Sequence, residues 1–149
     1  AVNLFGIGAS RLVAHDLAQK LMRVDKECHL YDDWHDQLLC AKNMHEGDIG
    51  IAFSYSGLTQ EVLDCTAEAQ RHNCLVVAVT KVDGSSKLAT MADAVLGVAA
   101  SEPLVRSGAM ASRMAQLMVV DALYAAYVAS DYERATHVIK QNYIEKQER

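Results

Sequence analysis

The sequence predicts an α/β fold, a three-layer α/β/α sandwich built around a five-stranded, parallel, doubly wound sheet. Short apolar stretches alternate with helical stretches along almost the whole chain, as in successive βαβ units. The segment 75–79 is a continuous apolar run, typical of a parallel strand that is covered on both faces. The length of 149 residues fits one domain with an adequate core, spanning residues 1–149.

The order of the elements follows from these patterns. Strands are expected at residues 2–7, 28–31, 48–53, 75–79 and 94–99, and helices at 10–24, 34–41, 59–73, 87–91, 108–129 and 131–147. Apolar residues recur at helical spacing in the first helix, and Asn73 is expected to end the third. If the strand order is 2-1-3-4-5, strands one and three are neighbours and the chain reverses direction between them.

One helical segment predicts an association between subunits. The stretch from Met114 to Ala129 is apolar nearly all round, broken only by Gln116 and Asp121. Such a helix is expected to be buried on several sides, and a domain this small often needs a second subunit to cover it. We therefore expect a homodimer.

The charge balance excludes several partners for this stretch of chain. Fourteen Lys and Arg residues stand against nineteen Asp and Glu, and no two basic residues are adjacent. A net charge of −5 does not favour binding to nucleic acid or to an anionic membrane, which both require clustered basic residues. The most apolar segment is short for a membrane span, so no membrane partner is expected. The absence of a basic leader and the immediate start of a strand suggest a fragment of a longer protein.

The metal-binding residue types are not arranged as metal sites. The four cysteines show no CxxC spacing, and the six histidines form neither HxH nor HExxH. We expect no metal and no cofactor, and free thiols that fit a cytoplasmic protein.

Two loops are the candidates for chemistry, because both are expected at the carboxyl ends of strands. Residues 6–10 read Gly-Ile-Gly-Ala-Ser, and residues 54–61 read Ser-Tyr-Ser-Gly-Leu-Thr-Gln-Glu. With strands one and three adjacent, both loops would face one crevice at the switch point, where doubly wound folds bind ligands.

The second loop has the composition of an anion site. The hydroxyls of Ser54, Ser56 and Thr59 are grouped at a helix start, and Gly57 allows a sharp turn. Free backbone N–H groups and the helix dipole favour an anion there. Hydroxyls and amides without a lysine or metal ligands suit a phosphate monoester, and the absence of GxxxxGK[ST] argues against nucleoside triphosphates.

Simpler interpretations of the same residues remain open. Thr59 could be an ordinary helix N-cap, with Glu61 complementing the dipole, and Ser54 and Ser56 could only form turns.

The first loop also permits a dinucleotide site. Gly6 and Gly8 begin a dinucleotide fingerprint, in which Asp32 or Asp33 could bind a ribose, but Arg11 occupies the position of the third glycine.

The loops carry a resemblance to a known family. Residues 54–61 resemble the SxSGxTxE signature of the sugar isomerase (SIS) domain, preceded by a GxGxS-type loop at residues 6–10. The segments 102–109, 112–117 and 121–124 narrow this likeness to the carboxy-terminal effector domain of RpiR-type transcriptional regulators.

The resemblance implies both a ligand and a role. It places a sugar phosphate with its phosphate on Ser54, Ser56 and Thr59 and on the Tyr55 backbone. The sugar would lie against a second group of residues: Gly8, Ala9, Ser10, Glu61, Glu102 and Arg106. The chain would then sense a phosphosugar for a bacterial regulator of carbohydrate metabolism genes. DNA would be bound only by an amino-terminal helix-turn-helix domain that this chain lacks.

Glu102 and Arg106 have two interpretations. They could contact sugar hydroxyls or a carboxylate, or they could belong to a solvated charged loop.

The alternative function is catalysis in the same pocket, either aldose–ketose isomerisation or elimination from a sugar ether. Both reactions need a positioned base, for which Glu61 or Glu102 would serve. No second convincing acid or base is found, so the sequence favours a sensor over an enzyme.

Overall fold

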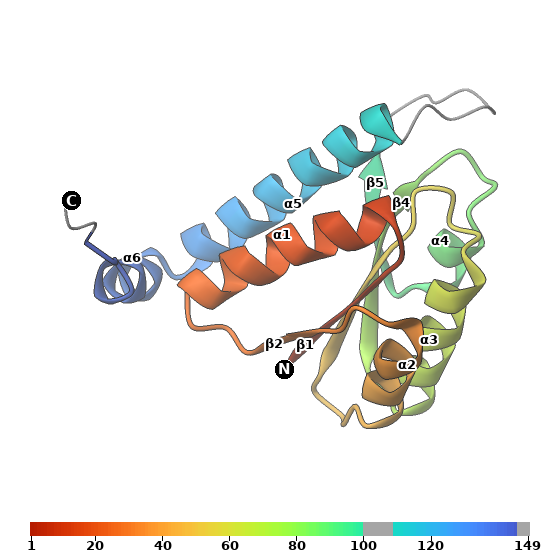
Figure 1. The fold of residues 1–149 in the computed structure, drawn as a ribbon, viewed down its shortest axis with the longest axis horizontal. Helices are drawn as coiled ribbons and strands as arrows, with labels where there is room; N and C mark the ends of the chain where they lie inside the picture. Colours follow the sequence, from red (N-terminus) through yellow and green to blue (C-terminus); the bar gives the residue numbers. More distant parts are fainter. Residues whose placement is uncertain (100–108, 146–149) are drawn as a thin grey trace.

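A computed structural model describes residues 1–99 and 109–145. Five parallel strands form one sheet in the order β2-β1-β3-β4-β5. The strands are β1 Val2–Gly6, β2 Cys28–Leu30, β3 Ile49–Phe53, β4 Leu75–Lys81 and β5 Ala94–Val98. The helices are α1 Ala9–Arg23, α2 Trp34–Lys42, α3 Gln60–Arg71, α4 Lys87–Met91, α5 Met110–Ser130 and α6 Tyr132–Gln141. Figure 1 shows α1 and α5 on one face of the sheet and α2, α3 and α4 on the other.

The expected fold class, strand order and sequence of elements are confirmed. Asn73 follows α3 with a φ of 57°, the left-handed conformation in which Asn often ends a helix. The last helix is shorter than expected, because it ends at Gln141 and not at residue 147. Asn142 is its C-cap, and the Asn142 side chain donates a hydrogen bond to the Arg23 carbonyl at the end of α1.

The two faces of the sheet bury two separate apolar cores. Successive residues of β1 alternate between them, since Leu4 packs beneath α1 and α5 whereas Phe5 packs against α2 and α3. Both side chains are fully buried. This two-sided burial explains why the central strands are mostly apolar, with Asn3 in β1 and Thr80 in β4 as buried polar exceptions.

The expectation that α5 is buried on several sides is wrong for the single chain. Its buried side chains, Ser112, Gln116 and Val120, form one stripe at a spacing of four residues. Met110, Met114 and Met118 lie on the helix with exposed fractions of 62%, 63% and 73%. A helix that packs on α1 and the sheet along one stripe leaves its other side to solvent or to a partner.

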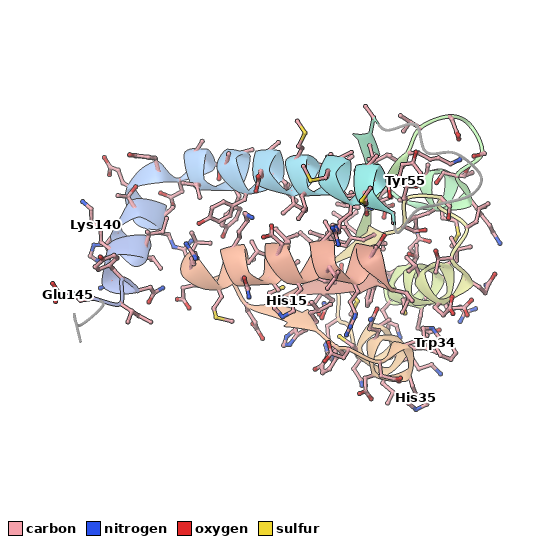
Figure 2. The ribbon with its side chains drawn as sticks, turned by 45° about the horizontal axis from the view of Figure 1, so that its top comes forward. His15, Trp34, His35, Tyr55, Lys140 and Glu145 are labelled. Atoms are coloured by element: carbon pink, nitrogen blue, oxygen red, sulfur yellow. The ribbon has the colours of Figure 1, made fainter. Side chains whose placement is uncertain are left out.

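The far end of α5 carries α6 away from the loops at the carboxyl edge. Lys140 and Glu145 lie at the opposite end of the molecule from Tyr55 (Figure 2). Among residues 1–99 and 109–145, no helix combines the length and the apolar character needed to cross a bilayer.

Thr66 allows a test of how a buried hydroxyl group affects the stability of the core. This α3 residue is fully buried, and its hydroxyl has no hydrogen-bond partner. Removing a buried unsatisfied hydroxyl while keeping the side-chain shape is neutral or stabilising. We predict that Thr66→Val leaves the free energy of unfolding unchanged or raises it by up to about 1 kcal/mol in urea denaturation.

Thr66→Ala is the matched control, because it also removes the hydroxyl but deletes the methyl group. It should destabilise the protein. A clear loss of stability in Thr66→Val would show that the hydroxyl has a partner in solution.

Candidate functional site

The two candidate loops leave neighbouring strands at the same edge of the sheet. β1 and β3 pair in parallel along their whole length, and Gly6 lies opposite Phe53 at the carboxyl end of the register. Residues 6–10 therefore begin beside residues 54–59. The sheet order makes this edge the topological switch point, so the expected placement of the two loops on neighbouring strands is confirmed, whereas a ligand site between them stays a prediction.

The first loop is anchored by a glutamine from α2. The buried Gln37 carboxamide accepts a hydrogen bond from Gly6 N at 3.0 Å and donates to Gly6 O at 3.0 Å. Its Nε2 also donates to the Tyr31 carbonyl at 2.9 Å, at the end of β2. Gly8 then turns the chain with a φ of 57°, and Ala9 and Ser10 open α1. The side chain thus fixes the point from which the first loop departs.

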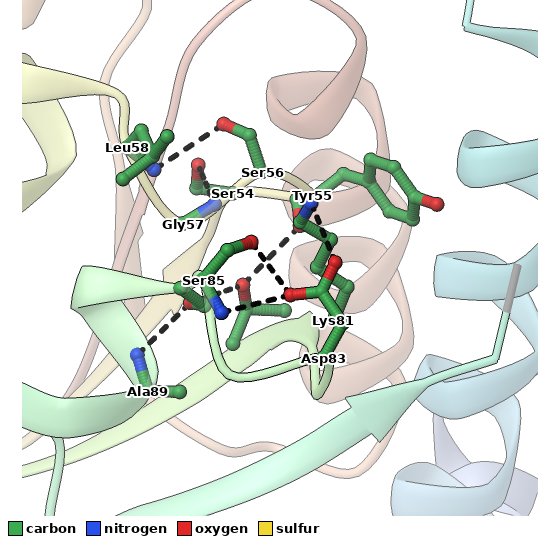
Figure 3. Close-up of polar contacts among 11 residues, drawn as sticks. Ser54, Tyr55, Ser56, Gly57, Leu58, Lys81, Asp83, Ser85 and Ala89 are labelled. Carbon is green, nitrogen blue, oxygen red and sulfur yellow. Dashed lines mark hydrogen bonds and ion pairs between the residues drawn. The ribbon is translucent and has the colours of Figure 1, made fainter. Parts of the chain in front are cut away.

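The second loop is held by its own hydroxyl groups (Figure 3). Ser54 Oγ lies 2.9 Å from Thr59 Oγ1 and accepts a hydrogen bond from Gly57 N at 3.1 Å. Ser56 Oγ accepts a hydrogen bond from Leu58 N at 3.2 Å. Ser54 and Ser56 therefore do form turns, as the simpler interpretation supposed. This role leaves their remaining hydrogen-bonding capacity for a ligand.

Thr59 does not act as an ordinary N-cap. It occupies the N-cap position of α3, but its side chain makes no capping hydrogen bond and instead meets Ser54. The first backbone bonds of the helix run from Val62 and Leu63 to the Thr59 carbonyl. The N–H groups of Gln60 and Glu61 precede them and have no acceptor in the helix. These donors and the helix dipole make the α3 terminus suited to an anion.

The three hydroxyl-bearing residues of the second loop differ in their exposure to solvent. Ser54 is 2% exposed, whereas Ser56 and Thr59 are half-buried at the surface of the loop. Ser56 and Thr59 are therefore the accessible hydroxyls, and Ser54 supports Thr59 from beneath. Glu61 is half-buried in the first turn of α3.

Tyr55 presents its backbone and not its ring to the loop. Its side chain is 7% exposed and packs in the core beneath α1 and α5. The Tyr55 carbonyl accepts hydrogen bonds from Lys81 N at 3.1 Å and from Thr80 Oγ1 at 3.3 Å. The second loop is thereby fastened to the end of β4.

Glycine at position 57 is required by a neighbouring loop. Gly57 has a φ of 68°, and a Cβ built on it would lie 1.8 Å from Ser86 Oγ and 2.6 Å from Ser86 Cβ. The Gly57 carbonyl also accepts a hydrogen bond from Leu88 N at 3.0 Å. The loop after β4 therefore packs directly against the back of the second loop.

The other predicted residues fall outside this arrangement. Glu102 and Arg106 lie outside the described residues. The two acids considered for a ribose are engaged elsewhere, because Asp32 forms an ion pair with Arg11 and Asp33 Oδ1 caps α2 by accepting from His35 N at 2.7 Å. These contacts do not favour the dinucleotide interpretation.

The residues that support the loops from behind were not predicted from the sequence. A single glutamine in a helix, such as Gln37, carries no signal. Thr80 follows the predicted strand 75–79 and was assigned no role, and Ser86 was predicted only as part of a turn. Trp34 and His35, at the start of α2, also lie toward this edge because α2 follows the carboxyl end of β2 (Figure 2).

The cysteines do not supply a nucleophile or a metal ligand. Burial raises the pKa of the Cys28 thiol to about 11 and that of the Cys65 thiol to about 12. Burial also raises the pKa values of Cys40 and Cys74. Thiols that stay protonated near neutral pH are poor nucleophiles and poor ligands. The described part of the chain contains no group of three His, Cys, Asp or Glu residues able to hold a metal.

A concave region lies at the opposite edge of the sheet, beside the start of β1. This cavity of about 640 Å³ is lined by the carboxylates of Glu27, Asp36 and Asp48 together with His29, His45 and the Ala1 amino group. The Ala1 amino group pairs with Asp48 at 2.6 Å, and His29 lies 3.3 Å from Glu27. Carboxylates therefore already pair with two of its basic groups, whereas the start of α3 offers unpaired backbone N–H groups to an anion.

The contact between Gly57 and Ser86 yields a stability prediction. Gly57→Ala combines a left-handed backbone with a clash against the Ser86 side chain and backbone, so it should strongly destabilise the protein. Gly84→Ala is the matched control, because Gly84 has a φ of 83° with nothing within 4 Å of a built Cβ. The control should cost only the backbone strain of about 1–2 kcal/mol in chemical denaturation. Equal losses in the two variants would contradict this packing.

Comparison with known proteins shows to which family the chain is related. Residues 2–126 match the SIS domain. An uncharacterized HTH-type transcriptional regulator of Caldanaerobacter subterraneus is 38% identical over 131 residues, covering 88% of this chain and 46% of that protein. The uncharacterized HTH-type transcriptional regulator YbbH of Bacillus subtilis is 36% identical over 139 residues, covering 93% and 49%. The chain spans about half the length of these curated relatives.

A solved structure agrees with the fold over nearly the whole chain. The Vibrio vulnificus NanR protein complexed with ManNAc-6P aligns with a TM-score of 0.86 at 29% identity, covering 94% of this chain and 52% of that one. Residues 2–126, which match the SIS domain model, include both loops, the whole sheet and most of α5. The chain therefore belongs to the SIS domain family.

Proposed function

We propose that this chain is the phosphosugar-sensing effector domain of a bacterial transcriptional regulator that controls carbohydrate metabolism genes. The observation that best supports this proposal is the second loop. There the accessible hydroxyls of Ser56 and Thr59 lie beside the unpaired N–H groups of α3 at the switch point of the sheet. The phosphate binds to Ser56, Thr59 and the loop backbone, with Ser54 supporting Thr59. The sugar extends toward Gly8, Ala9 and Ser10.

The comparisons support the regulatory role. The relatives are HTH-type regulators of about twice the length. The solved structure of NanR is a complex with the sugar phosphate ManNAc-6P. In this proposal residues 1–149 form one SIS domain of a cytoplasmic protein. An amino-terminal helix-turn-helix domain in the full-length protein binds DNA. The acidic charge of the SIS domain is then compatible with a DNA-binding regulator.

The domain senses the phosphosugar without turning it over. Isomerisation or ether elimination requires a base close to the carbon acid. Within the two loops, residues 6–10 and 54–61, the carboxylate is Glu61, which stands in the first turn of α3 and stabilises that turn. Glu102 and Arg106 complete the sugar side of the pocket as ligand contacts in this proposal.

Ligand binding is transmitted through a homodimer. The exposed Met110, Met114 and Met118 give α5 an unpartnered apolar side, and flexible methionines adapt well to an opposing surface. A phosphosugar that orders the loops at the rim of the pocket shifts the dimer geometry and so the spacing of the DNA-binding domains. Coupling between such sites is typically about 1–3 kcal/mol.

The binding prediction concerns the two accessible hydroxyls. The double variant Ser56→Ala, Thr59→Ala should weaken phosphosugar binding at least about tenfold, since hydrogen bonds to a charged group contribute about 1.5–3 kcal/mol each. Isothermal titration calorimetry with hexose phosphates, amino-sugar phosphates including ManNAc-6P, and a lactyl ether of an amino-sugar phosphate measures the effect. Each ligand is paired with its unphosphorylated sugar.

Ser85→Ala is a suitable control, because Ser85 is exposed and bonds to Asp83. Unchanged affinity in the double variant would refute the phosphate site. Product formation from any ligand of the panel, followed by NMR, would refute the sensor and favour the enzyme.

The dimer prediction concerns the methionines of α5. Met114→Glu with Met118→Glu should convert the dimer to a monomer in sedimentation velocity without loss of the folded circular dichroism spectrum. Met22→Glu is the control, because Met22 is 72% exposed on α1 and outside the proposed interface. A monomeric unsubstituted chain, or a dimer that survives both substitutions, would contradict the proposed interface.

A further inference from the structure

We propose that Thr80 and Ser86 are positioning residues for the anion site: they fix the peptide that joins Tyr55 to Ser56, so that Ser56 N–H faces the ligand. Neither side chain belongs to the two loops that hold the phosphosugar. Both stand behind the second loop, at the end of β4 and in the turn before α4. The inference rests on the proposed function, because it concerns the same site.

A directed chain of hydrogen bonds runs from α4 to the second loop. Ala89 N donates to Ser86 Oγ at 3.1 Å, Ser86 Oγ and Thr80 Oγ1 are 2.9 Å apart, and Thr80 Oγ1 is 3.3 Å from the Tyr55 carbonyl. The carbonyl can only accept, so the single Thr80 proton goes to it. The Ser86 proton must then go to Thr80 Oγ1. Both hydroxyls are buried, where such chains polarise and strengthen one another.

This chain determines the direction of a ligand-facing donor. The Tyr55 carbonyl points toward β4, where it accepts from Thr80 Oγ1 and Lys81 N. In a planar trans peptide the following N–H points the opposite way, and the described residues contain no cis peptide. Ser56 N–H therefore points away from β4. Since β3 lies between β4 and β1, this direction leads to the crevice beside the first loop.

Steric contact with Ser86 also restricts the next part of the second loop, at Gly57. Ser86 Oγ, Cβ and Cα occupy the space that a side chain on Gly57 would need. Leu88 N donates to the Gly57 carbonyl at 3.0 Å, two peptides further along. The segment from the end of β4 to the start of α4 thus bonds to the carbonyls of Tyr55 and Gly57, on either side of Ser56. A preorganised donor of this kind needs no rearrangement when the anion arrives.

The test removes one hydroxyl and keeps the shape. Thr80→Val deletes the side-chain donor to the Tyr55 carbonyl and leaves the backbone donor Lys81 N, and Thr80→Ser restores the hydroxyl. Thr90→Val is the matched control, because Thr90 Oγ1 donates to the Ser86 carbonyl at 3.4 Å, outside the chain that reaches Tyr55. The probes are inorganic phosphate and ManNAc-6P, titrated into the 149-residue chain and followed by calorimetry and by the Ser56 amide resonance.

We expect Thr80→Val to weaken binding of both probes by about fivefold or more and to move the Ser56 amide resonance of the free protein. Thr80→Ser and Thr90→Val should stay within about twofold of the unsubstituted chain. Ser86→Ala should weaken binding in the same direction as Thr80→Val. It serves as the second variant if Thr80→Val does not fold.

Three outcomes decide the proposal. Unchanged affinity in both Thr80→Val and Ser86→Ala would overturn the positioning role while leaving the phosphosugar function intact. Weakened binding in Thr80→Val that Thr80→Ser does not rescue would also overturn it, because the hydroxyl would then be irrelevant. An unsubstituted chain that binds neither these probes nor the wider panel of sugar phosphates would refute the proposed function itself.

Discussion

The parallel pairing of β1 with β3 is the constraint on which the site depends. It brings together two loops that are more than forty residues apart in the sequence, and it places them where the sheet reverses its winding direction. In the proposed site both loops are needed, since one supplies the helix terminus and hydroxyls for the phosphate and the other lies beside the sugar. The two apolar cores matter to function because they fix this pairing.

Each loop is also held by side chains from outside it. Gln37 forms hydrogen bonds with both the N–H and the carbonyl of Gly6, where the first loop begins. Thr80, which is hydrogen-bonded to Ser86, donates to the Tyr55 carbonyl of the second loop. The polar groups of these side chains are buried, where an unmade hydrogen bond is costly. These hydrogen bonds hold the backbone of the proposed site from behind, while the hydroxyls of Ser56 and Thr59 are partly exposed.

The sequence predicted the sheet and the position of the loops because both follow from periodicity. Buried parallel strands are apolar without interruption, and a loop after such a strand must lie at the carboxyl edge. The hydroxyl density of residues 54–59 predicts an anion site from a similarly local pattern, and the site itself stays a prediction. The position of Thr59 at the start of α3 was predicted, but its bond to Ser54 in place of a cap was not, since it depends on the path of the loop.

The features that the sequence did not predict come from contacts between distant segments. Ser86 and Gly57 are close only because β4 lies beside β3. The local sequence of residues 83–86, Asp-Gly-Ser-Ser, does not distinguish a turn that packs against another loop from a solvent-exposed turn. The exposure of α5 was missed for a related reason. Its composition resembles that of a helix covered on all sides, but only one side of it, centred on the buried Gln116 and Val120, packs against this chain's own core.

The most direct test of the central claim is the backbone amide spectrum of the isotopically labelled chain, recorded with ManNAc-6P and with unphosphorylated N-acetylmannosamine. The account predicts that the phosphorylated sugar selectively shifts the amides of residues 56–61, with smaller changes at residues 8–10, and that the unphosphorylated sugar does not. Shifts confined to the acidic cavity beside β1 and β2, or equal shifts with both sugars, would contradict a phosphate site at the start of α3.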